Sequence, residues 1–282
     1  LEYNILSALR KISQRDKKRI GFLQGHGELK EPQTMNARAV LSPYFYLTSL
    51  SFNSRESLNE LNDLDGLIIA NPTQPFSPLD LYFIDQFVMN GGRLMVFMNA
   101  LSHNEDSLSK NLMEHTTRKN LKLDKMLFDY GINIHENYVF DRICGYRMYR
   151  QAISSWPYHV LASPSLHPIT RNIDPVSLEY CNELQLIQTP GVKLTKILTS
   201  SANSNRSGLA PQISIADFQI FGENPAFVEN PEDPINKITL AAIAEGQIPS
   251  HFVNRDVLIN VDTLTSIIPN LSLIHISEPT RR

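Results

Sequence analysis

The sequence predicts an α/β fold with a parallel sheet and helical crossovers, followed by a strand-rich C-terminal part. Three observations predict it. A strand–helix–strand unit spans Asp63–Met98, a short apolar run at Ile20–Leu23 ends in a glycine-containing turn, and helical periodicity is lost after about Asp141. We therefore expect an α/β domain over residues 1–140. Residues 141–270 would complete that domain or pack on it.

The unit at Asp63–Met98 carries a separate signal for each of its elements. Leu67–Ala70 has the length and continuous apolarity of a buried strand. Ser77 stands at a helix N-cap position with Asp80 in the first turn, and a Gly-Gly pair at 91–92 ends the helix. Leu94–Met98 is then a second buried strand. This order forms a βαβ unit, which joins parallel strands.

Weaker patterns place the remaining elements. We expect helices at residues 1–12, 34–41, 54–61 and 123–130, and strands at 20–23, 44–50, 132–134, 138–140, 158–161, 184–187, 194–198 and 238–245. The long polar stretch at residues 99–119 is expected to be a functional or mobile loop. The Ser-, Asn- and Gly-rich residues 200–209 are expected to form a second mobile loop.

The composition is that of an ordinary soluble globular protein, with 42% hydrophobic and 20% charged residues. A net charge of −3 carries no overall signature of binding to nucleic acid or to an anionic membrane. No apolar run approaches the roughly 20 residues that a membrane-spanning helix needs. Cys144 and Cys181 lack metal-binding spacing, so two free thiols are favoured over the alternative of one disulfide. We expect neither a cofactor nor a metal.

The two ends of the sequence indicate a fragment. It begins at Leu1 without an initiator Met, and residues 271–282 look like the translation of a sequencing-library adapter rather than a natural polar tail. We therefore exclude residues 271–282 from the fold, as fusion scars are excluded, and expect the natural protein to continue differently after about Asn270.

Polar side chains follow the first predicted strand and the strand at Leu67–Ala70. His26 and Glu28 lie in a Gly-His-Gly-Glu loop directly after the first strand, and Asn71, Thr73 and Gln74 follow the other. Ligands bind at the carboxyl ends of strands in open α/β sheets, so we expect these residues to line one cleft. His26 and Glu28 are chemically able to bind a metal or move a proton. The alternative is a pair of tight turns whose polar groups satisfy neighbouring backbone.

Several catalytic motifs are missing from the sequence. It contains no Gly-x-Ser-x-Gly nucleophile elbow and no phosphate-binding Gly-x-x-x-x-Gly-Lys-Ser/Thr loop. The turn after Leu94–Met98, where a thiol hydrolase of this architecture would carry its nucleophile, reads Asn99-Ala100-Leu101-Ser102 and has no cysteine. The sequence therefore argues against a thiol hydrolase and against an ATP-driven motor.

Four segments in order resemble the gliding-motility ABC-transporter auxiliary protein GldG and its relatives. They are Leu1-Glu2-Tyr3 with Ile5, the strand and Gly-His-Gly-Glu loop at 20–28, the Asn-Pro, Ser-Pro and Gly-Gly landmarks within Asp63–Met98, and Leu240–Gly246 followed by Ser250, Phe252, Asn254 and Arg255. The arrangement also resembles the flavodoxin-like, class I glutamine-amidotransferase-like architecture.

The resemblance implies a non-catalytic, substrate-binding-like auxiliary domain of a membrane ABC-type transport system. Its partners would be the ABC permease and ATPase subunits and an envelope or saccharide ligand, with no nucleic acid. The domain would face the periplasm at a bacterial inner membrane, attached through segments missing from this fragment. Glu245, Ser250, Asn254 and Arg255 would form a docking loop, unless that loop only joins two strands.

Two other functions stay open at this point. One is a degenerate hydrolase or a metal-dependent enzyme that uses His26, Glu28 and the segment at residues 99–119. The other is a structural spacer between membrane helices. An enzyme should place His26 and Glu28 beside a third titratable residue in a pocket, whereas a binding module need not.

Overall fold

The computed structural model describes residues 17–52, 55–104, 106–108, 113–149, 152–208, 211–214 and 237–253. The chain divides into two compact units, Leu1–Met98 with Pro249–Arg282, and Asn99–Ile248. The change in composition near Asp141 thus falls inside the second unit. The predicted opening helix, Asn254, Arg255 and residues 271–282 lie outside the described residues.

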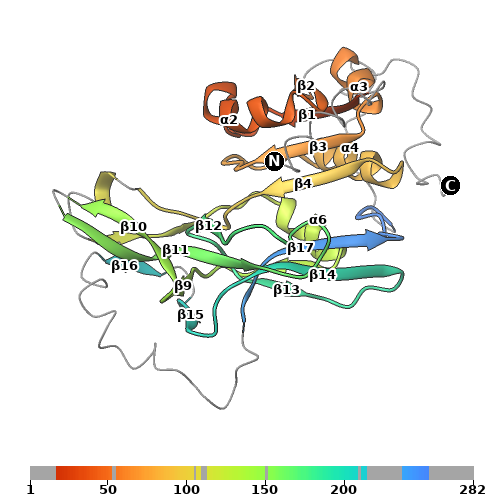
Figure 1. Ribbon diagram of the computed structural model, residues 1–282. Helices are drawn as coiled ribbons and strands as arrows, with labels where there is room; N and C mark the ends of the chain where they lie inside the picture. Colours follow the sequence, from red (N-terminus) through yellow and green to blue (C-terminus); the bar gives the residue numbers. More distant parts are fainter. Residues whose placement is uncertain are drawn as a thin grey trace, which may run out of the picture. The chain divides into compact units, whose positions relative to one another are not determined.

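The first unit contains a four-stranded parallel sheet in the order β2-β1-β3-β4 (Figure 1). Its strands are β1 (Lys18–Leu23), β2 (Phe45–Leu50), β3 (Gly66–Ala70) and β4 (Arg93–Phe97). β1 pairs in parallel with both β2 and β3, and β3 pairs in parallel with β4. The predicted parallel sheet of an α/β protein is confirmed.

Three described helices belong to this unit: α2 (Glu31–Leu41), α3 (Arg55–Asn62) and α4 (Pro78–Met89). α4 begins as predicted, because the Ser77 hydroxyl accepts a hydrogen bond from the Asp80 amide and the Asp80 carboxylate accepts one from the Ser77 amide. It ends at Met89 with Asn90 as its C-cap, and Gly91 follows with a φ of 90°.

The two strands of the βαβ unit differ in burial. Leu67 and Ile69 on one face of β3 are fully buried, and Ile68 and Ala70 on the other face are also buried. This is the pattern of a central parallel strand. The prediction that Leu94–Met98 is equally buried was wrong, because Phe97 is 58% exposed and Met95 is 53% exposed. β4 ends the described sheet, and an apolar run does not reveal whether both of its faces are covered.

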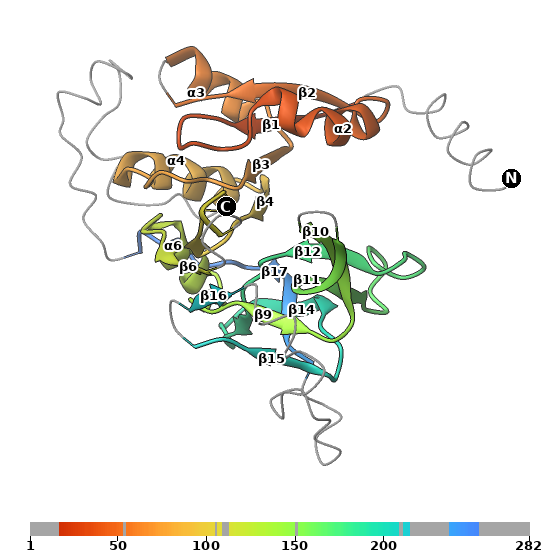
Figure 2. The ribbon, with the colours of Figure 1, turned by 90° about the vertical axis from the view of Figure 1, so that its left-hand side faces the viewer.

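The second unit is built mainly of antiparallel strands. Its elements are β5 (Leu101–Ser102), β6 (Met113–His115), β7 (Thr117–Arg118), α6 (Leu123–Asp129), β8 (Ile132–Ile134), β9 (Val139–Asp141), β10 (Cys144–Tyr149), β11 (Ala152–Pro164), β12 (Val176–Glu179), β13 (Leu184–Leu186), β14 (Val192–Thr199), β15 (Ser204–Arg206), β16 (Gln212–Ser214) and β17 (Thr239–Gly246). The largest sheet has the order β10-β11-β14-β17, with β12 also paired to β11. Figure 2 shows β17, in blue, beside β14, although the two are far apart in the sequence.

Two segments expected to be loops contain strands instead. Within residues 99–119, β5 pairs with β7 and β6 pairs with β16. Within residues 200–209, β15 pairs with β9. These strands are two or three residues long and largely polar, so they carry no alternating apolar signal and form only because a partner strand lies beside them.

An aromatic cluster forms one core of the second unit. Its buried members are Leu101, Leu108, Tyr138, Trp156, Tyr158, Tyr180 and Ile213. Trp156 is fully buried, and its indole N–H donates to the Tyr180 hydroxyl at 3.0 Å. Among the residues that the structure describes, no helix has the length and apolar character to cross a membrane.

Candidate functional site

The loop after β1 is shaped by two glycines. Gly25 has a φ of 125° and Gly27 a φ of 72°, which other residues rarely adopt. Gly27 also lies so close to the loop after β3 that a Cβ there would be 2.0 Å from the Thr73 hydroxyl oxygen. The Gly-His-Gly-Glu sequence is therefore explained by backbone conformation at both glycines and by close approach at Gly27.

His26 is enclosed by groups from three parts of the first unit. Its Nδ1 lies 3.2 Å from Glu28 Oε1, and its Nε2 lies 3.1 Å from Asp80 Oδ2. The imidazole stacks on Phe76 with ring centroids 3.9 Å apart. Only 8% of the His26 surface is exposed. Two carboxylates facing the two ring nitrogens favour the doubly protonated imidazolium, in which both nitrogens donate.

The charges follow from this geometry. Burial by itself would lower the pKa of His26, but the hydrogen bonds to Asp80 and Glu28 and their negative charges outweigh burial and raise it to about 9. Burial would raise the pKa of Asp80, but the hydrogen bonds from His26 and Ser77 lower it. Ser77 contributes its hydroxyl, which donates to Asp80 Oδ2 at 2.6 Å. His26 is therefore a cation held between two acids at neutral pH.

Glu28 acts on the loop backbone as well as on the imidazole. Its Oε2 accepts a hydrogen bond from the His26 amide at 2.7 Å. The Glu28 side chain is fully buried. A buried carboxylate that pairs with a cation and caps a backbone amide stabilises one loop conformation. Both ring nitrogens of His26 are already engaged, so this arrangement leaves no lone pair for a general base.

The loop after β3 meets the loop after β1 through backbone groups. The amides of Thr73 and Gln74 donate to the His26 carbonyl at 2.9 and 2.8 Å. The Thr73 hydroxyl donates to the Gly27 carbonyl at 3.2 Å. Asn71 adopts a left-handed φ of 51°, and its amide donates to the Phe97 carbonyl at 2.7 Å. The two loops expected to share a ligand site are thus in direct contact, with Thr73 and Gln74 exposed and Asn71 half-buried.

The residues of the expected docking loop have different surroundings. Ser250 is buried in the first unit, where its hydroxyl donates to Asp85 Oδ2 at 2.6 Å. The His251 amide donates to Asp85 Oδ1 at 2.8 Å, and Phe252 packs against Tyr82 of α4 with centroids 5.5 Å apart. Glu245 lies in β17 of the second unit, opposite Lys193 of β14.

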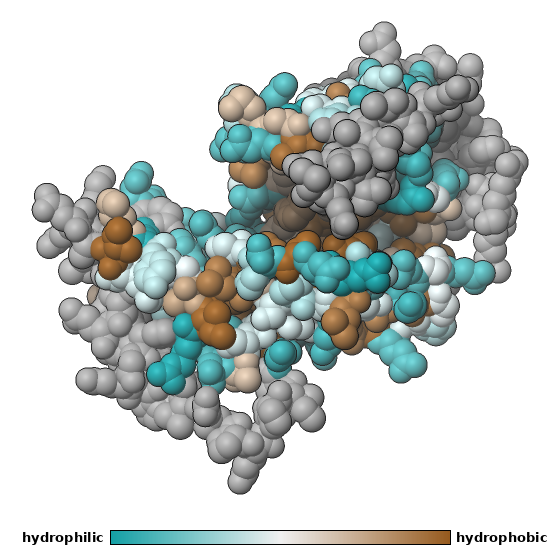
Figure 3. All heavy atoms as spheres, in the orientation of Figure 1, coloured by the Kyte–Doolittle hydropathy of each residue, from teal (hydrophilic) through white to brown (hydrophobic). Residues whose placement is uncertain are grey.

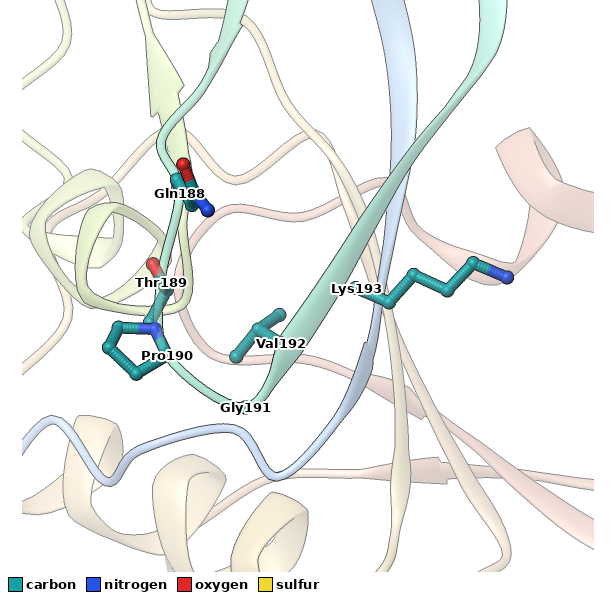
Figure 4. A pocket seen from close by; sticks show the side chains of 6 residues that line it. All are labelled: Gln188, Thr189, Pro190, Gly191, Val192 and Lys193. Atoms are coloured by element: carbon teal, nitrogen blue, oxygen red, sulfur yellow. The ribbon is translucent and has the colours of Figure 1, made fainter.

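A shallow hollow of about 750 Å³ lies at the turn from β13 to β14 in the second unit. Residues Gln188–Lys193 line it, and the Lys193 side chain extends away from the other five (Figure 4). Gly191 and Gly246 cross closely here, since a Cβ on Gly246 would lie 2.4 Å from the Gly191 carbonyl oxygen. We did not predict this hollow, although the Pro190-Gly191 pair is a turn signal.

Sequence reasoning missed two acidic residues that organise the first unit. Asp80 was expected only as a favourable charge in the first turn of α4, and it also binds His26. Asp85 is fully buried and holds Ser250 and the His251 amide. The sequence offers one signal for Asp85, which stands among apolar residues of the predicted helix. An acid on the buried face of a helix needs a partner, so this position indicates a long-range contact.

No metal site or disulfide appears in the described part of the chain. It contains no group of three or more His, Cys, Asp or Glu side chains arranged to hold a metal ion. Both cysteines are free, Cys144 half-buried and Cys181 buried. Burial raises the pKa of Cys144 to about 11 and that of Cys181 to about 12, so neither thiol is an activated nucleophile near neutral pH.

Comparison with known proteins gives a family match and several weak likenesses to solved structures, two of which are described here. The N-terminal domain of mmIFT52 shares 15% identity and a TM-score of 0.46, covering 66% of this chain and 74% of that one. A ThuA-like protein from Bacteroides uniformis ATCC 8492 shares 16% identity and a TM-score of 0.37, covering 66% of this chain and 68% of that one. No curated protein matches, and the two structural likenesses are too low to support an argument.

The family match covers nearly the whole chain. A family model described as "ABC-type uncharacterized transport system" matches residues 17–269, which include all of the second unit, most of the first, and every described strand and helix. The protein therefore belongs to this family and is an auxiliary domain of an ABC-type transport system.

Proposed function

We propose that this chain is a non-catalytic, ligand-binding domain that serves a membrane ABC-type transport system like that of gliding motility. The observation that carries the proposal is the double engagement of His26. Its two ring nitrogens face Glu28 and Asp80, and its ring is stacked on Phe76. A histidine held in this way supports a loop rather than moving protons during turnover.

In this proposal the side chains of Asn71, Thr73 and Gln74 form the ligand-binding surface. His26 and Glu28 hold the loops that carry it in position. The His26 carbonyl holds the Thr73 and Gln74 amides, and both side chains are exposed. Amide and hydroxyl groups match the donors and acceptors of a saccharide or another hydroxyl-rich envelope ligand. The ABC permease and ATPase subunits would be the protein partners, and the domain would face the periplasm from a bacterial inner membrane.

We also propose that the first unit is flavodoxin-like, related in architecture to the class I glutamine amidotransferases. The described strand order β2-β1-β3-β4 supports this, because it is the beginning of the flavodoxin order 2-1-3-4-5. In that architecture ligands bind outside the carboxyl ends of the strands near the point where the order reverses, which here is where the loops of His26 and Thr73 meet.

The second candidate is a degenerate hydrolase or metal-dependent enzyme, and one observation favours it. A third titratable residue, Asp80, does lie beside His26 and Glu28. Both carboxylates are engaged by the His26 imidazolium, however, and the serine in contact with Asp80 hydrogen-bonds that carboxylate rather than His26. That geometry does not activate a hydroxyl for attack.

The decisive experiment uses the full-length protein, tagged and extracted from its native membrane with a mild detergent. We expect it to co-purify with a permease subunit and a P-loop ATPase, and deletion of its gene should abolish gliding. Recovery of the protein alone, together with hydrolysis of ester or amide substrates that is lost in the His26→Asn variant, would favour the enzyme. Protease protection in spheroplasts would contradict a periplasmic location.

A ligand screen tests whether the side chains of the loop after β3 contact a ligand. A glycan array probed with the purified chain should lose signal in the Gln74→Ala variant, while the exposed-site control Gln212→Ala keeps it. Equal signals for Gln74→Ala, Thr73→Ala and the unmodified chain would remove this loop as the binding surface and leave the family assignment unaffected.

A further inference from the structure

One face of the parallel sheet in the first unit is covered unevenly. Its buried members are Phe22, Ile68 and Ala70. In the parallel register Met95 of β4 lies beside Ile68, and Phe97 lies beside Ala70, so β4 continues the same face. Met95 is nevertheless 53% exposed and Phe97 58% exposed. We call these two side chains the open part of the face, and Figure 3 shows brown, apolar spheres in the region of the view where Figure 1 places β4.

The crossover helices explain why this part of the face is left open. α2 leads from β1 to β2, and its Leu41 packs against the buried members of the face. α3 and α4 lead in the opposite direction along the sheet, from β2 to β3 and from β3 to β4. Right-handed crossovers that step in opposite directions lie on opposite faces. α2 is therefore the one described helix of this unit on the face of Met95 and Phe97, and it covers the side of β1 and β2.

The chain before β1 carries an apolar stripe that needs such a face. The helix predicted over residues 1–12 lies outside the described residues, and the sequence places Leu1, Ile5, Leu9 and Ile12 on one side of it. An isolated helix of this length is marginal in water, so it depends on burial of the stripe. The stripe would be about 16 Å long, which is also the length of a five-residue strand such as β4.

The connection to β1 limits where this helix is able to lie. Residues 13–17 join it to β1, and in an extended conformation they span roughly 16 Å. β4 is two strand positions from β1, a distance of about 10 Å, and is therefore within reach. A helix that ends beside the amino end of β1 and lies along the sheet runs antiparallel to the strands. In that direction Leu9 would lie over Met95 and Ile5 over Phe97.

We propose that residues 1–12 form a helix that docks on Met95 and Phe97 and completes this face of the sheet. The apolar stripe and the open part of the face agree in chemistry, in length and in position. Leu1 would lie at the carboxyl edge of the sheet, which also carries the loops of His26 and Thr73. The start of this chain would therefore stand beside the candidate ligand-binding surface, whatever ligand that surface takes.

A second copy of the chain is the competing occupant. β4 ends the described sheet, and an apolar edge strand is able to associate with another chain. A tethered segment, however, acts at an effective concentration in the millimolar range, which favours residues 1–12 over a free partner. Docking within one chain is also independent of protein concentration, whereas association of two copies is not.

An engineered cysteine pair in the intact chain tests the docking. Leu9→Cys with Met95→Cys should form a disulfide within one chain on mild oxidation. The matched control, Ser7→Cys with Met95→Cys, places the first cysteine on the opposite side of the helix and should be linked at least about tenfold less. Mass spectrometry of the digested chain identifies the linked peptides and separates them from those of the two native free thiols.

Hydrogen exchange provides a second measurement that needs no new bond. Deletion of residues 1–12 should speed exchange of the β4 amides about tenfold or more and leave β2 unchanged. Ile5→Ser with Leu9→Ser should act like the deletion, and Ser7→Ala should change nothing.

Two results would overturn the proposal. One is equal or absent linkage of the cysteines at positions 7 and 9, or β4 exchange that the deletion leaves unchanged. The other is linkage between two chains, seen as a dimer on a non-reducing gel, which would assign the open part of the face to a second copy.

Discussion

Nε2 of His26 lies 3.1 Å from Oδ2 of Asp80, 54 positions away in the sequence, and this contact joins the loop after β1 to the first turn of α4. The other ring nitrogen faces Glu28. One buried cation thus holds together two acids, a glycine loop and a helix N-terminus. Removing it leaves at least one carboxylate buried without its partner, which is costly.

The first prediction concerns the His26→Ala variant. It should lower the free energy of unfolding by about 2–4 kcal/mol, because Glu28 then remains buried without its cation. Urea unfolding followed by circular dichroism measures this. The control His115→Ala, at an exposed position of β6, should cost less than about 0.5 kcal/mol. If His26→Ala unfolds like the control, the histidine is not structural and a direct role in binding becomes the better explanation.

The second prediction concerns pH. The folded-state pKa of His26 is raised from 6.5 to about 9, so its contribution to stability is fully present below about pH 6.5 and is lost as the pH rises through 9. The full loss corresponds to roughly 3 kcal/mol. The pKa of Asp80 is lowered, so its contribution is present above the usual carboxylate range and is lost as the pH falls through its folded value.

Urea midpoints measured across this range test the assignment. They should be highest in mildly acidic buffer, and the fall between about pH 6.5 and 9 should be absent from His26→Ala. An identical alkaline fall in the variant would mean that another group titrates there.

The third prediction concerns the segment held by Asp85. Asp85→Ala should cost about 2–4 kcal/mol, and Ser250→Ala about 1–2 kcal/mol, because Asp85 is fully buried and accepts from Ser250 and His251. The double variant should cost less than the sum of the two. Thermal unfolding and proteolysis near residues 249–253 provide the readouts, with Ser155→Ala on exposed β11 as control. Strict additivity would show that the hydrogen bond contributes nothing.

The fourth prediction separates backbone strain from steric clash at glycine. Gly246→Ala should be strongly destabilising, by about 2 kcal/mol or more, because φ is 111° and the new Cβ meets the Gly191 carbonyl. Gly25→Ala has a positive φ but open space, so it should cost about 1 kcal/mol. Gly208→Ala has neither problem and should be close to neutral. A different ranking of the three unfolding midpoints would contradict the close approach of Gly246 to the Gly191 carbonyl, where β14 and β17 meet.

The fifth prediction concerns the thiols. Because burial raises the pKa of both cysteines, iodoacetamide at about pH 8 should label the folded chain slowly, Cys181 more slowly than Cys144. Unfolding in guanidinium without reductant should make both react. Two cysteines that stay unreactive until reductant is added would instead reveal a disulfide.

Local chemistry in the sequence determined much of the first unit. Ser77 and Asp80 start α4 through groups three residues apart, and Gly91 ends it. The continuous apolar run Leu67–Ala70 specified a strand buried on both faces, and the βαβ order specified parallel pairing. The polar residues after β1 and β3 were identified because the carboxyl ends of neighbouring parallel strands meet at one edge of a sheet.

Only the tertiary structure decided what those polar residues touch. The bond from Ser250 to Asp85 spans 165 positions, and the contact between His26 and Asp80 spans 54. Caps, turns and periodicity act within a few residues, so the sequence reveals them directly. The pairing of short polar strands such as β15 with β9, the exposure of β4 and the burial of charged groups depend on neighbours that the finished fold supplies, because burial and long-range hydrogen bonds exist only after distant segments have packed.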